Sequence, residues 1–333
     1  MKTNNSVESP RFTAYVKKVR AAASGMGESV PSDGGFLLGR EMVAGLTSQI
    51  YTGRLSELCT RMTIGSFGCT VPMLDERSRV DGSRAGGVEA FWRDEGAAIT
   101  ESNPQFRAVE LNLRKLTAML TLTDETWEDA LGLEAMLVAT LGNEFGFKLD
   151  DAILRRDGAT RPLGILNCGA LITVPKAGGQ ANYTILAANV LAMYERMWAG
   201  GHRGAVWIAN SEIASQLMSI QLTGAGGTPA FVFGNRDKGE LDTLLGHPVY
   251  WTEQASVIGD VGDLTFADMG QYLLAQRGET EIASSIHVEF LTDQSKLRFI
   301  LRVDGQPLWS APLVPYKGAS SRSPFVTLAA RKP

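Results

Sequence analysis

The chain has 333 residues, of which 44% are hydrophobic, so it is long enough to bury a sizeable core in one or two domains. Its formal net charge of −4 at pH 7 excludes a protein whose main function is to bind nucleic acid, because such proteins need a dense basic surface. The odd number of cysteines and the absence of a CxxC pair predict reduced, mostly buried thiols at Cys59, Cys69 and Cys168.

The beginning of the chain carries no apolar secretory signal, and no run of 18 apolar residues predicts a membrane span. We therefore expect folding in the cytosol.

Residues 11–23 have apolar side chains along one side of a predicted helix, and residues 24–35 have the composition of a flexible segment. Helical spacing resumes over residues 36–62, and a strand is predicted to begin within residues 65–74.

The most polar stretch of the chain is residues 75–95, which contain few side chains suited to a core. A structureless loop of this length is uncommon inside a compact domain. We therefore interpret the stretch as a hairpin arm that projects from the body, and the alternative of a solvated loop stays open. Its charged residues are Asp75, Glu76, Arg77, Arg79, Asp81, Arg84, Glu89, Arg93, Asp94 and Glu95.

A long strand is predicted over residues 106–125, where apolar side chains alternate with polar ones. The phase of this alternation changes at Arg114–Lys115, which predicts a bulge or bend, because the side-chain period of a strand is two. From Trp127 to Arg156 the apolar residues then fall on one helical face. At 1.5 Å per residue this helix would be about 45 Å long.

The second half of the chain alternates short elements. Residues 157–166 predict a turn and an apolar strand, and residues 183–198 an amphipathic helix. A buried strand (204–210) leads into a helix (211–220) capped by Asn210 or Ser211. A glycine-rich loop is predicted over residues 223–240. Four further strands are predicted after it, within residues 244–253, 262–278, 285–291 and 297–305.

No motif for catalysis or metal binding stands out. The three histidines, His202, His247 and His287, are scattered, and no GxSxG nucleophile elbow occurs. The loop at residues 224–227 is glycine-rich but lacks the GK[ST] of a phosphate-binding loop. The acidic pairs are interpreted as structural, among them Asp150–Asp151 on the polar side of the long helix. We therefore expect no enzyme, no cofactor and no metal.

The order of several motifs resembles the major capsid proteins of tailed bacteriophages with the Hong-Kong-97-type fold. Each motif is weak alone, and their order and spacing carry the resemblance, which covers roughly residues 34–315. The motifs are Gly34–Leu38, Asp157–Leu166, Ala205–Asn210, Leu244–Val249, Gly262–Asp268 with Tyr272, and Arg302–Gly305.

The resemblance implies an α+β fold with an N-terminal arm, an extended β-hairpin loop, a peripheral domain with a long spine helix, and an axial α/β domain. It implies the arm at residues 1–40, a connecting helix at 41–67 and the extended loop at 68–105. The peripheral domain would comprise 106–166 and 279–333, and the axial domain 167–278.

The resemblance further implies a structural protein that self-assembles through pentamers and hexamers into the icosahedral head of a tailed double-stranded-DNA phage. The virion would be its location, after assembly in the host cytoplasm. Separate scaffolding, portal and decoration proteins are further candidate partners, the packaged DNA would be bound without sequence specificity, and no membrane is involved. Two alternatives stay open: an encapsulin-like nanocompartment shell and a cytosolic α/β enzyme.

The expected inter-subunit contacts are in two places. On the extended loop they are Asp75, Glu76, Arg77, Arg79, Arg84 and Arg93, and on the loop nearest the capsomer axis they are Gly226, Gly227 and Arg236. Some members of the family cross-link through a lysine on the extended loop. Here no lysine lies between Lys18 and Lys115, so we expect a shell without such isopeptide bonds.

Overall fold

The computed structural model describes residues 55–96, 101–123, 133–223, 229–231, 242–278, 281–289 and 294–333. The expected N-terminal arm and most of the helix expected at 36–62 lie outside these residues. The chain divides into two compact units. Unit 1 comprises residues 1–51, 115–145 and 278–302, and unit 2 comprises residues 52–114, 146–277 and 303–333.

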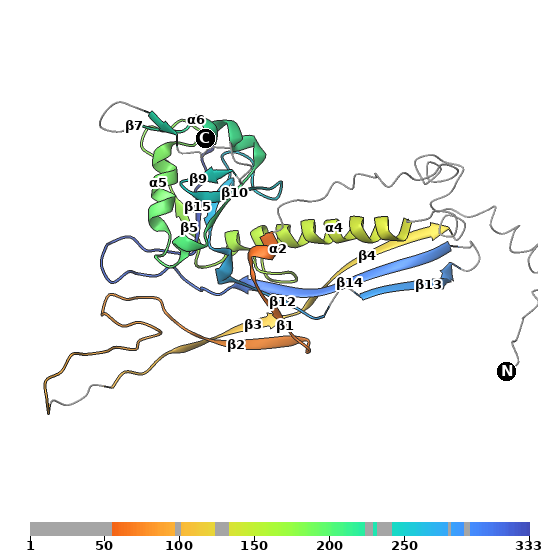
Figure 1. Cartoon of the computed structure of the whole chain (residues 1–333), viewed down its shortest axis with the longest axis horizontal. Helices are drawn as coiled ribbons and strands as arrows, with labels where there is room; N and C mark the ends of the chain where they lie inside the picture. The colour runs from red at the N-terminus through yellow and green to blue at the C-terminus, as the bar shows by residue number, and fades with distance from the viewer. Residues whose placement is uncertain are drawn as a thin grey trace, which may run out of the picture. The chain divides into compact units, whose positions relative to one another are not determined.

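Unit 2 contains a six-stranded sheet whose strand order is β5-β15-β11-β6-β10-β9 (Figure 1). Of its four inner strands, β15, β11 and β6 are buried along their whole length, as expected for strands covered on both faces. The bounds are β5 Ile172–Val174, β15 Phe325–Leu328, β11 Leu264–Ala267, β6 Val206–Ala209, β10 His247–Trp251 and β9 Thr243–Leu244.

Helices α5 (Ala187–Arg196) and α6 (Ala214–Ser219) pack their apolar sides into the core of this sheet. At its centre the rings of Trp207 and Phe266 stack with centroids 4.2 Å apart. The Trp207 indole N–H also donates to the carbonyl of Leu244 at 2.9 Å, so its one polar atom is satisfied within the core.

The last strand of the chain belongs to this sheet. Strand β15 lies between β5, to which it is parallel, and β11, to which it is antiparallel. The sequence analysis had placed all of residues 279–333 in the peripheral domain, and the pairing moves Phe325–Leu328 into the α/β sheet instead. The apolar sequence of this strand does not indicate which of the two sheets it joins, because both sheets offer an apolar environment.

A second sheet in unit 2 is formed by β1 (Thr60–Thr63), β12 (Tyr272–Gln276) and the end of β14 (Gln294–Pro307). Strand β1 is parallel to β12, and β12 is antiparallel to β14 from Tyr272–Pro307 to Gln276–Val303. Thus β12, expected with the axial domain, pairs instead with β14. The short helix α2 (Leu55–Leu58) precedes β1, and the small pair β7 (Gln221–Thr223) and β8 (Pro229–Phe231) follows α6.

In residues 157–166, after the long helix, the predicted turn is confirmed and the strand predicted to follow it is wrong. A bridge between Asp157 and Leu163 closes the turn, and a 3-10 helix follows at Ile165–Asn167. Gly164 lets the chain return against the end of the long helix, since a Cβ there would meet the Arg155 amide nitrogen at 2.6 Å. Further 3-10 helices lie at Gly201–Arg203, Ser211–Ile213 and Met269–Gln271.

The long helix α4 (Leu133–Arg155) and the strands β4 (Arg114–Thr123), β13 (Glu281–Glu289) and β14 supply most of the described part of unit 1. Strand β13 is antiparallel to β14, and β4 also pairs with β14. The predicted helix end at Arg156 agrees with the observed end at Arg155. The predicted start at Trp127 lies outside the described residues.

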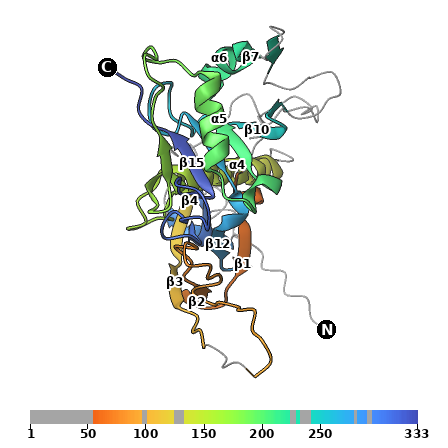
Figure 2. The same cartoon turned by 90° about the vertical axis from the view of Figure 1, so that its left-hand side faces the viewer.

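The predicted phase change at Arg114–Lys115 is confirmed, since both residues are exposed between the two alternating stretches, and the break between the strands lies at Leu113. Strand β3 (Phe106–Asn112) ends before Leu113 and pairs with β2 (Gly68–Leu74), whereas β4 begins at Arg114 and pairs with β14. The chain therefore changes its partner strand at the break, which explains why the buried face changes there. Strands β2 and β3 form an antiparallel hairpin, and the loop that joins them extends away from it (Figures 1 and 2).

Candidate functional site: the loop between β2 and β3

The base of the loop is hydrogen-bonded to its own subunit. The Arg79 amide donates to the Val314 carbonyl at 2.9 Å, and the Val314 amide donates to the Arg77 carbonyl at the same distance. Across the loop, the Gln105 amide donates to the Gly86 carbonyl at 2.8 Å. Gly86 has a positive φ of 76°, and a Cβ there would meet the Gln105 carbonyl oxygen at 2.6 Å. Glycine is therefore required at this turn.

The charges at the base are paired within the chain. Arg77 lies 3.0 Å from the Asp75 carboxylate, Arg79 lies 2.5 Å from Glu76, and Arg107 lies 3.7 Å from Asp75. Asp75, Glu76, Arg77 and Arg79 therefore have charge partners within their own chain, and their expected contacts with other copies stay a prediction. The tight local path of the chain brings residues two and three positions apart together, which the composition does not reveal.

The tip of the loop, residues 91–96, is exposed throughout. Trp92 is fully exposed at 103%, and Phe91 is 47% exposed. The Arg93 guanidinium lies 5.3 Å from the centre of the Phe91 ring, so this predicted contact residue stacks on its own loop. Asp94 and Glu95 have no ion-pair partner among the described residues. The sequence analysis stressed the charges and missed the aromatic pair, whose signal was two adjacent aromatic residues within a polar stretch.

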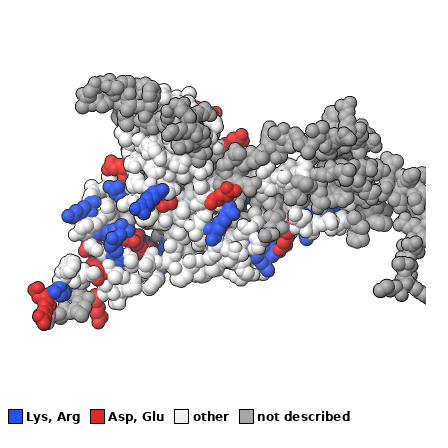
Figure 3. Space-filling model, viewed as in Figure 1, with Lys and Arg blue, Asp and Glu red and all other residues white. Residues whose placement is uncertain are grey.

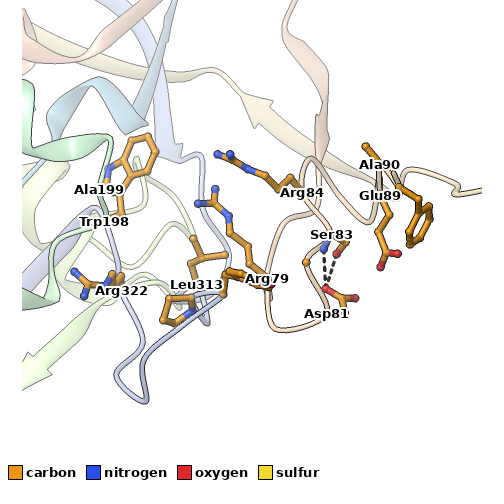
Figure 4. A pocket seen from close by; sticks show the side chains of 14 residues that line it. Arg79, Asp81, Ser83, Arg84, Glu89, Ala90, Trp198, Ala199, Leu313 and Arg322 are labelled. Carbon is orange, nitrogen blue, oxygen red and sulfur yellow. Dashed lines mark hydrogen bonds between the residues drawn. The ribbon is translucent and has the colours of Figure 1, made fainter. Parts of the chain in front are cut away.

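A pocket of about 550 Å³, here called the base pocket, lies between the loop base and residues 313–322 of the same unit (Figure 4). Figure 4 shows the guanidinium groups of Arg79 and Arg84 directed toward the side where Trp198 and Arg322 lie, and Asp81 and Glu89 on the other side of the loop. The lining residues that matter are Arg79, Asp81, Arg84, Glu89, Phe91, Trp198, Leu313, Tyr316 and Arg322.

Two of the three arginines in the base pocket have no acidic partner among the described residues. Arg84 is exposed and Arg322 donates to the backbone carbonyls of Glu195 and Met197, at 2.9 and 3.4 Å. The acid Asp81 is engaged elsewhere, because its carboxylate accepts hydrogen bonds from the amide and hydroxyl of Ser83, which lower its pKa. The side of the base pocket near Trp198 is therefore cationic.

The aromatic wall of the base pocket is fixed in place. The Trp198 indole N–H donates to the Asp268 carboxylate at 3.2 Å, and the Trp198 and Trp309 rings pack at a centroid distance of 5.4 Å. Burial raises the pKa of Asp268, and the bond from Trp198 opposes that rise. A half-buried indole held beside two guanidiniums can receive a flat apolar side chain and a carboxylate at the same time.

No catalytic or metal-binding arrangement accompanies this pocket. No histidine lines the base pocket. His202 and His247 pack against the Tyr194 ring instead, with centroid distances of 4.7 and 5.7 Å, and His287 lies in β13 of unit 1. Burial and the neighbouring His247 lower the pKa of His202. In the described ranges no group of three or more His, Cys, Asp or Glu side chains could hold a metal ion.

The other predicted site lies outside the described residues: Gly226, Gly227 and Arg236 fall in the ranges 224–228 and 232–241. For the part of the chain that the structure describes, none of the helices combines the length and apolarity needed to cross a membrane.

Comparison with known proteins gives a consistent result. Residues 48–318 match the phage capsid family. The solved capsid of an empty GTA particle, computed with C5 symmetry, superposes with a TM-score of 0.65 and 18% identity, covering 91% of this chain and 99% of that one. A Mycobacterium phage Adephagia chain gives 0.60 and 14%, covering 90% and 97%. A Gordonia phage Cozz chain gives 0.56 and 12%, covering 89% and 92%. No curated protein sequence matches this chain.

Proposed function

This chain belongs to the phage capsid family as a structural major capsid protein of a tailed phage, and from that premise we propose how its copies hold together. Its fold is the Hong-Kong-97-type fold expected from the motif order. The copies would form pentamers and hexamers in the host cytoplasm, and these would close into the icosahedral shell of the virion. The loop between β2 and β3 would supply the main contact of each copy with its neighbour.

The observation that carries this proposal is the contrast between the base and the tip of the loop. The base is fixed to its own subunit by backbone hydrogen bonds through Val314, while Phe91 and Trp92 at the tip are left unburied. Large apolar side chains that lie next to each other and are exposed on a monomer form the kind of patch that marks an interaction site. In a closed symmetric assembly every subunit repeats such a contact, so a small surface is used many times.

The packaged double-stranded DNA would be enclosed without sequence-specific contacts. The net charge of −4 fits a wall to which the DNA does not bind tightly. On the face drawn in Figure 3, basic and acidic side chains are intermixed over the described residues and do not form a field of one sign. Separate scaffolding, portal and decoration proteins would complete the particle. Because the loop carries no lysine for a covalent cross-link, the shell would be stabilised by non-covalent contacts or by a decoration protein.

The test is assembly of the purified full-length chain, alone and with the phage's scaffolding protein. Electron microscopy and sedimentation should show rings of five and six subunits or closed shells. Particles purified from infected cells should contain nuclease-protected double-stranded DNA, whereas a co-purifying enzyme would indicate a nanocompartment instead. A chain that stays monomeric under both conditions would contradict the proposal.

A further inference from the structure

We propose that the loop tip of one copy docks into the base pocket of a second copy, with Asp94 and Glu95 facing Arg84 and Arg322 and with Trp92 against the wall formed by Trp198. This contact rests on the proposed function and gives it specific residues. It makes the aromatic tip and the unpaired arginines, rather than the charges at the loop base, the groups that hold neighbours together.

The base pocket has the size and chemistry for such an occupant. Its volume of about 550 Å³ lies within the range of roughly 300–1,000 Å³ typical of pockets that enclose ligand-sized groups. One side offers the Trp198 ring, which is held by Asp268 and Trp309. The same side offers the guanidiniums of Arg84 and Arg322, which have no acidic partner in the described part of the chain. Guanidiniums and carboxylates form strong, directional pairs when they meet.

The tip has the complementary chemistry. Trp92 is fully exposed, and the adjacent Phe91 is covered only in part, by Arg93. Arg93 stacks on Phe91, and the carboxylates of Asp94 and Glu95 have no ion-pair partner among the described residues. Tryptophan is among the residues that most often dominate interface energies.

Trp92, Asp94 and Glu95 do not enter the base pocket of their own subunit. All three are exposed in the isolated chain and none lines the pocket, whereas Phe91 at the start of the tip is part of its lining. A contact of Trp92, Asp94 and Glu95 with the pocket therefore joins two different groups of residues on two copies. Such head-to-tail contacts generate closed rings when the rotation between neighbours closes, and pentamers and hexamers are rings of this kind.

A charge exchange tests the contact directly. R84E alone and E95R alone should each lower the yield of assembled rings or shells about 10-fold or more, because like charges then face each other. The double variant R84E/E95R should restore at least about half of the wild-type yield, since the two exchanged side chains again form an opposite-charge pair while Asp94 still faces Arg322. The matched control is R203E, which changes an exposed arginine of the 3-10 helix Gly201–Arg203 that does not line the pocket, and its yield should stay within about twofold of wild type.

Folding must be separated from docking. The changed side chains are exposed, so the unassembled variants should melt at the wild-type temperature and give the wild-type circular dichroism spectrum. W92A, which leaves all charges in place, should also reduce assembly while the melting temperature stays unchanged.

A disulfide provides a second, independent readout. In a C69S background, R84C/E95C should give an oxidised ladder that ends at five or six linked chains, while R84C and E95C alone should give no ladder. If the wild type assembles but the charge exchange gives no rescue and no ladder forms, the docking contact is overturned and the proposed function stands. If the wild type never assembles, the proposed function itself fails, and the docking contact fails with it.

Discussion

At the scale of single residues, the C-terminal end of the chain is fixed by one buried ion pair. The Arg331 guanidinium and the Asp263 carboxylate contact each other, and both side chains are fully buried. Arg331 also donates to the Thr184 carbonyl at 2.9 Å, and Asp263 accepts from the amides of Gly259 and Leu264, at 2.9 and 2.7 Å. The hydrogen bonds satisfy groups that would otherwise be costly to bury.

Removing one partner of this pair should therefore be severe. We expect R331M to lower the free energy of unfolding by about 3–5 kcal/mol, because an uncompensated carboxylate would remain buried at Asp263. Urea unfolding of the unassembled subunit measures this. K332M is the matched control: Lys332 pairs with Asp260 at the surface, and its loss should leave the free energy of unfolding close to the wild-type value. Equal losses of unfolding free energy in R331M and K332M would show that the buried ion pair stabilises the subunit no more than the surface pair does.

The cysteines give a pH-dependent prediction. Burial raises the pKa of Cys59 to about 12 and that of Cys168 to about 11. The thiolate is the reactive form, so at pH 8 only about one Cys59 thiol in 10,000 is reactive. We expect a thiol reagent at pH 8 to label the half-buried Cys69 first in the native subunit. Cys59 and Cys168 should react only after denaturant is added.

Mass spectrometry of the labelled peptides identifies the sites. Raising the pH from 8 toward 10 should increase labelling of the two buried thiols, since the thiolate fraction grows as the pH approaches a raised pKa. Rapid labelling of Cys59 or Cys168 in the native subunit at pH 8 would contradict the burial that the structure gives them.

At the scale of elements, α2 depends on α4 for its N-terminal cap. The Asp150 carboxylate, fully buried in α4, accepts from the amides of Leu55 and Ser56, each at 3.0 Å. The sequence analysis placed Asp150 on the polar side of the long helix, and its burial corrects that placement. A four-residue helix has too few internal hydrogen bonds to be stable alone, so this distant carboxylate orders it.

The cap can be weakened without changing its size. An asparagine side chain has one acceptor oxygen in place of two, so D150N should leave one of the two amides unsatisfied and cost about 1–3 kcal/mol. Thermal unfolding gives the change. The control is D151N at the next position, where the carboxylate pairs with a part-exposed Arg156 and the loss should be about 1 kcal/mol or less. A D150N subunit as stable as D151N would contradict the capping role.

At the scale of the whole molecule, we expect copies of the chain to associate through non-covalent contacts. No lysine lies between Lys18 and Lys115, so the extended loop has no amine for the isopeptide bond that the family resemblance implies in some members. The loop instead presents a fully exposed Trp92 and, at its tip, Asp94 and Glu95, which have no ion-pair partner among the described residues. The stability of a shell would then come from the sum of many repeated contacts.

This gives a prediction for the mature particle. Purified shells, boiled in detergent under reducing conditions, should run on a denaturing gel as a single band at the subunit mass of 35.9 kDa. Shell dissociation should also shift with salt concentration, because exposed ion pairs at the loop contacts are screened. A ladder of covalent multimers that survives reduction would overturn the non-covalent shell.

The sequence by itself determined the elements whose signal is local, and the family through the order of its motifs. The side-chain alternation in β14 placed Leu297, Phe299, Leu301 and Val303 on one face, and all four are buried. Asn210 was identified as a candidate cap, and it accepts from the amide of Glu212 at 3.0 Å. Both features depend on residues a few positions apart, which a sequence displays directly.

Only the tertiary structure decided which surfaces meet. It paired β15 with β5 and β11, gave Asp150 to a helix 94 residues away, and brought Trp198 and Arg322 beside the loop base. It also paired Asp75 and Glu76 with neighbouring arginines, which left the aromatic tip and two other arginines as the available groups. These outcomes depend on contacts between residues that are far apart in the sequence. For each such residue many possible partners have the same polarity, and the local sequence pattern does not distinguish among them.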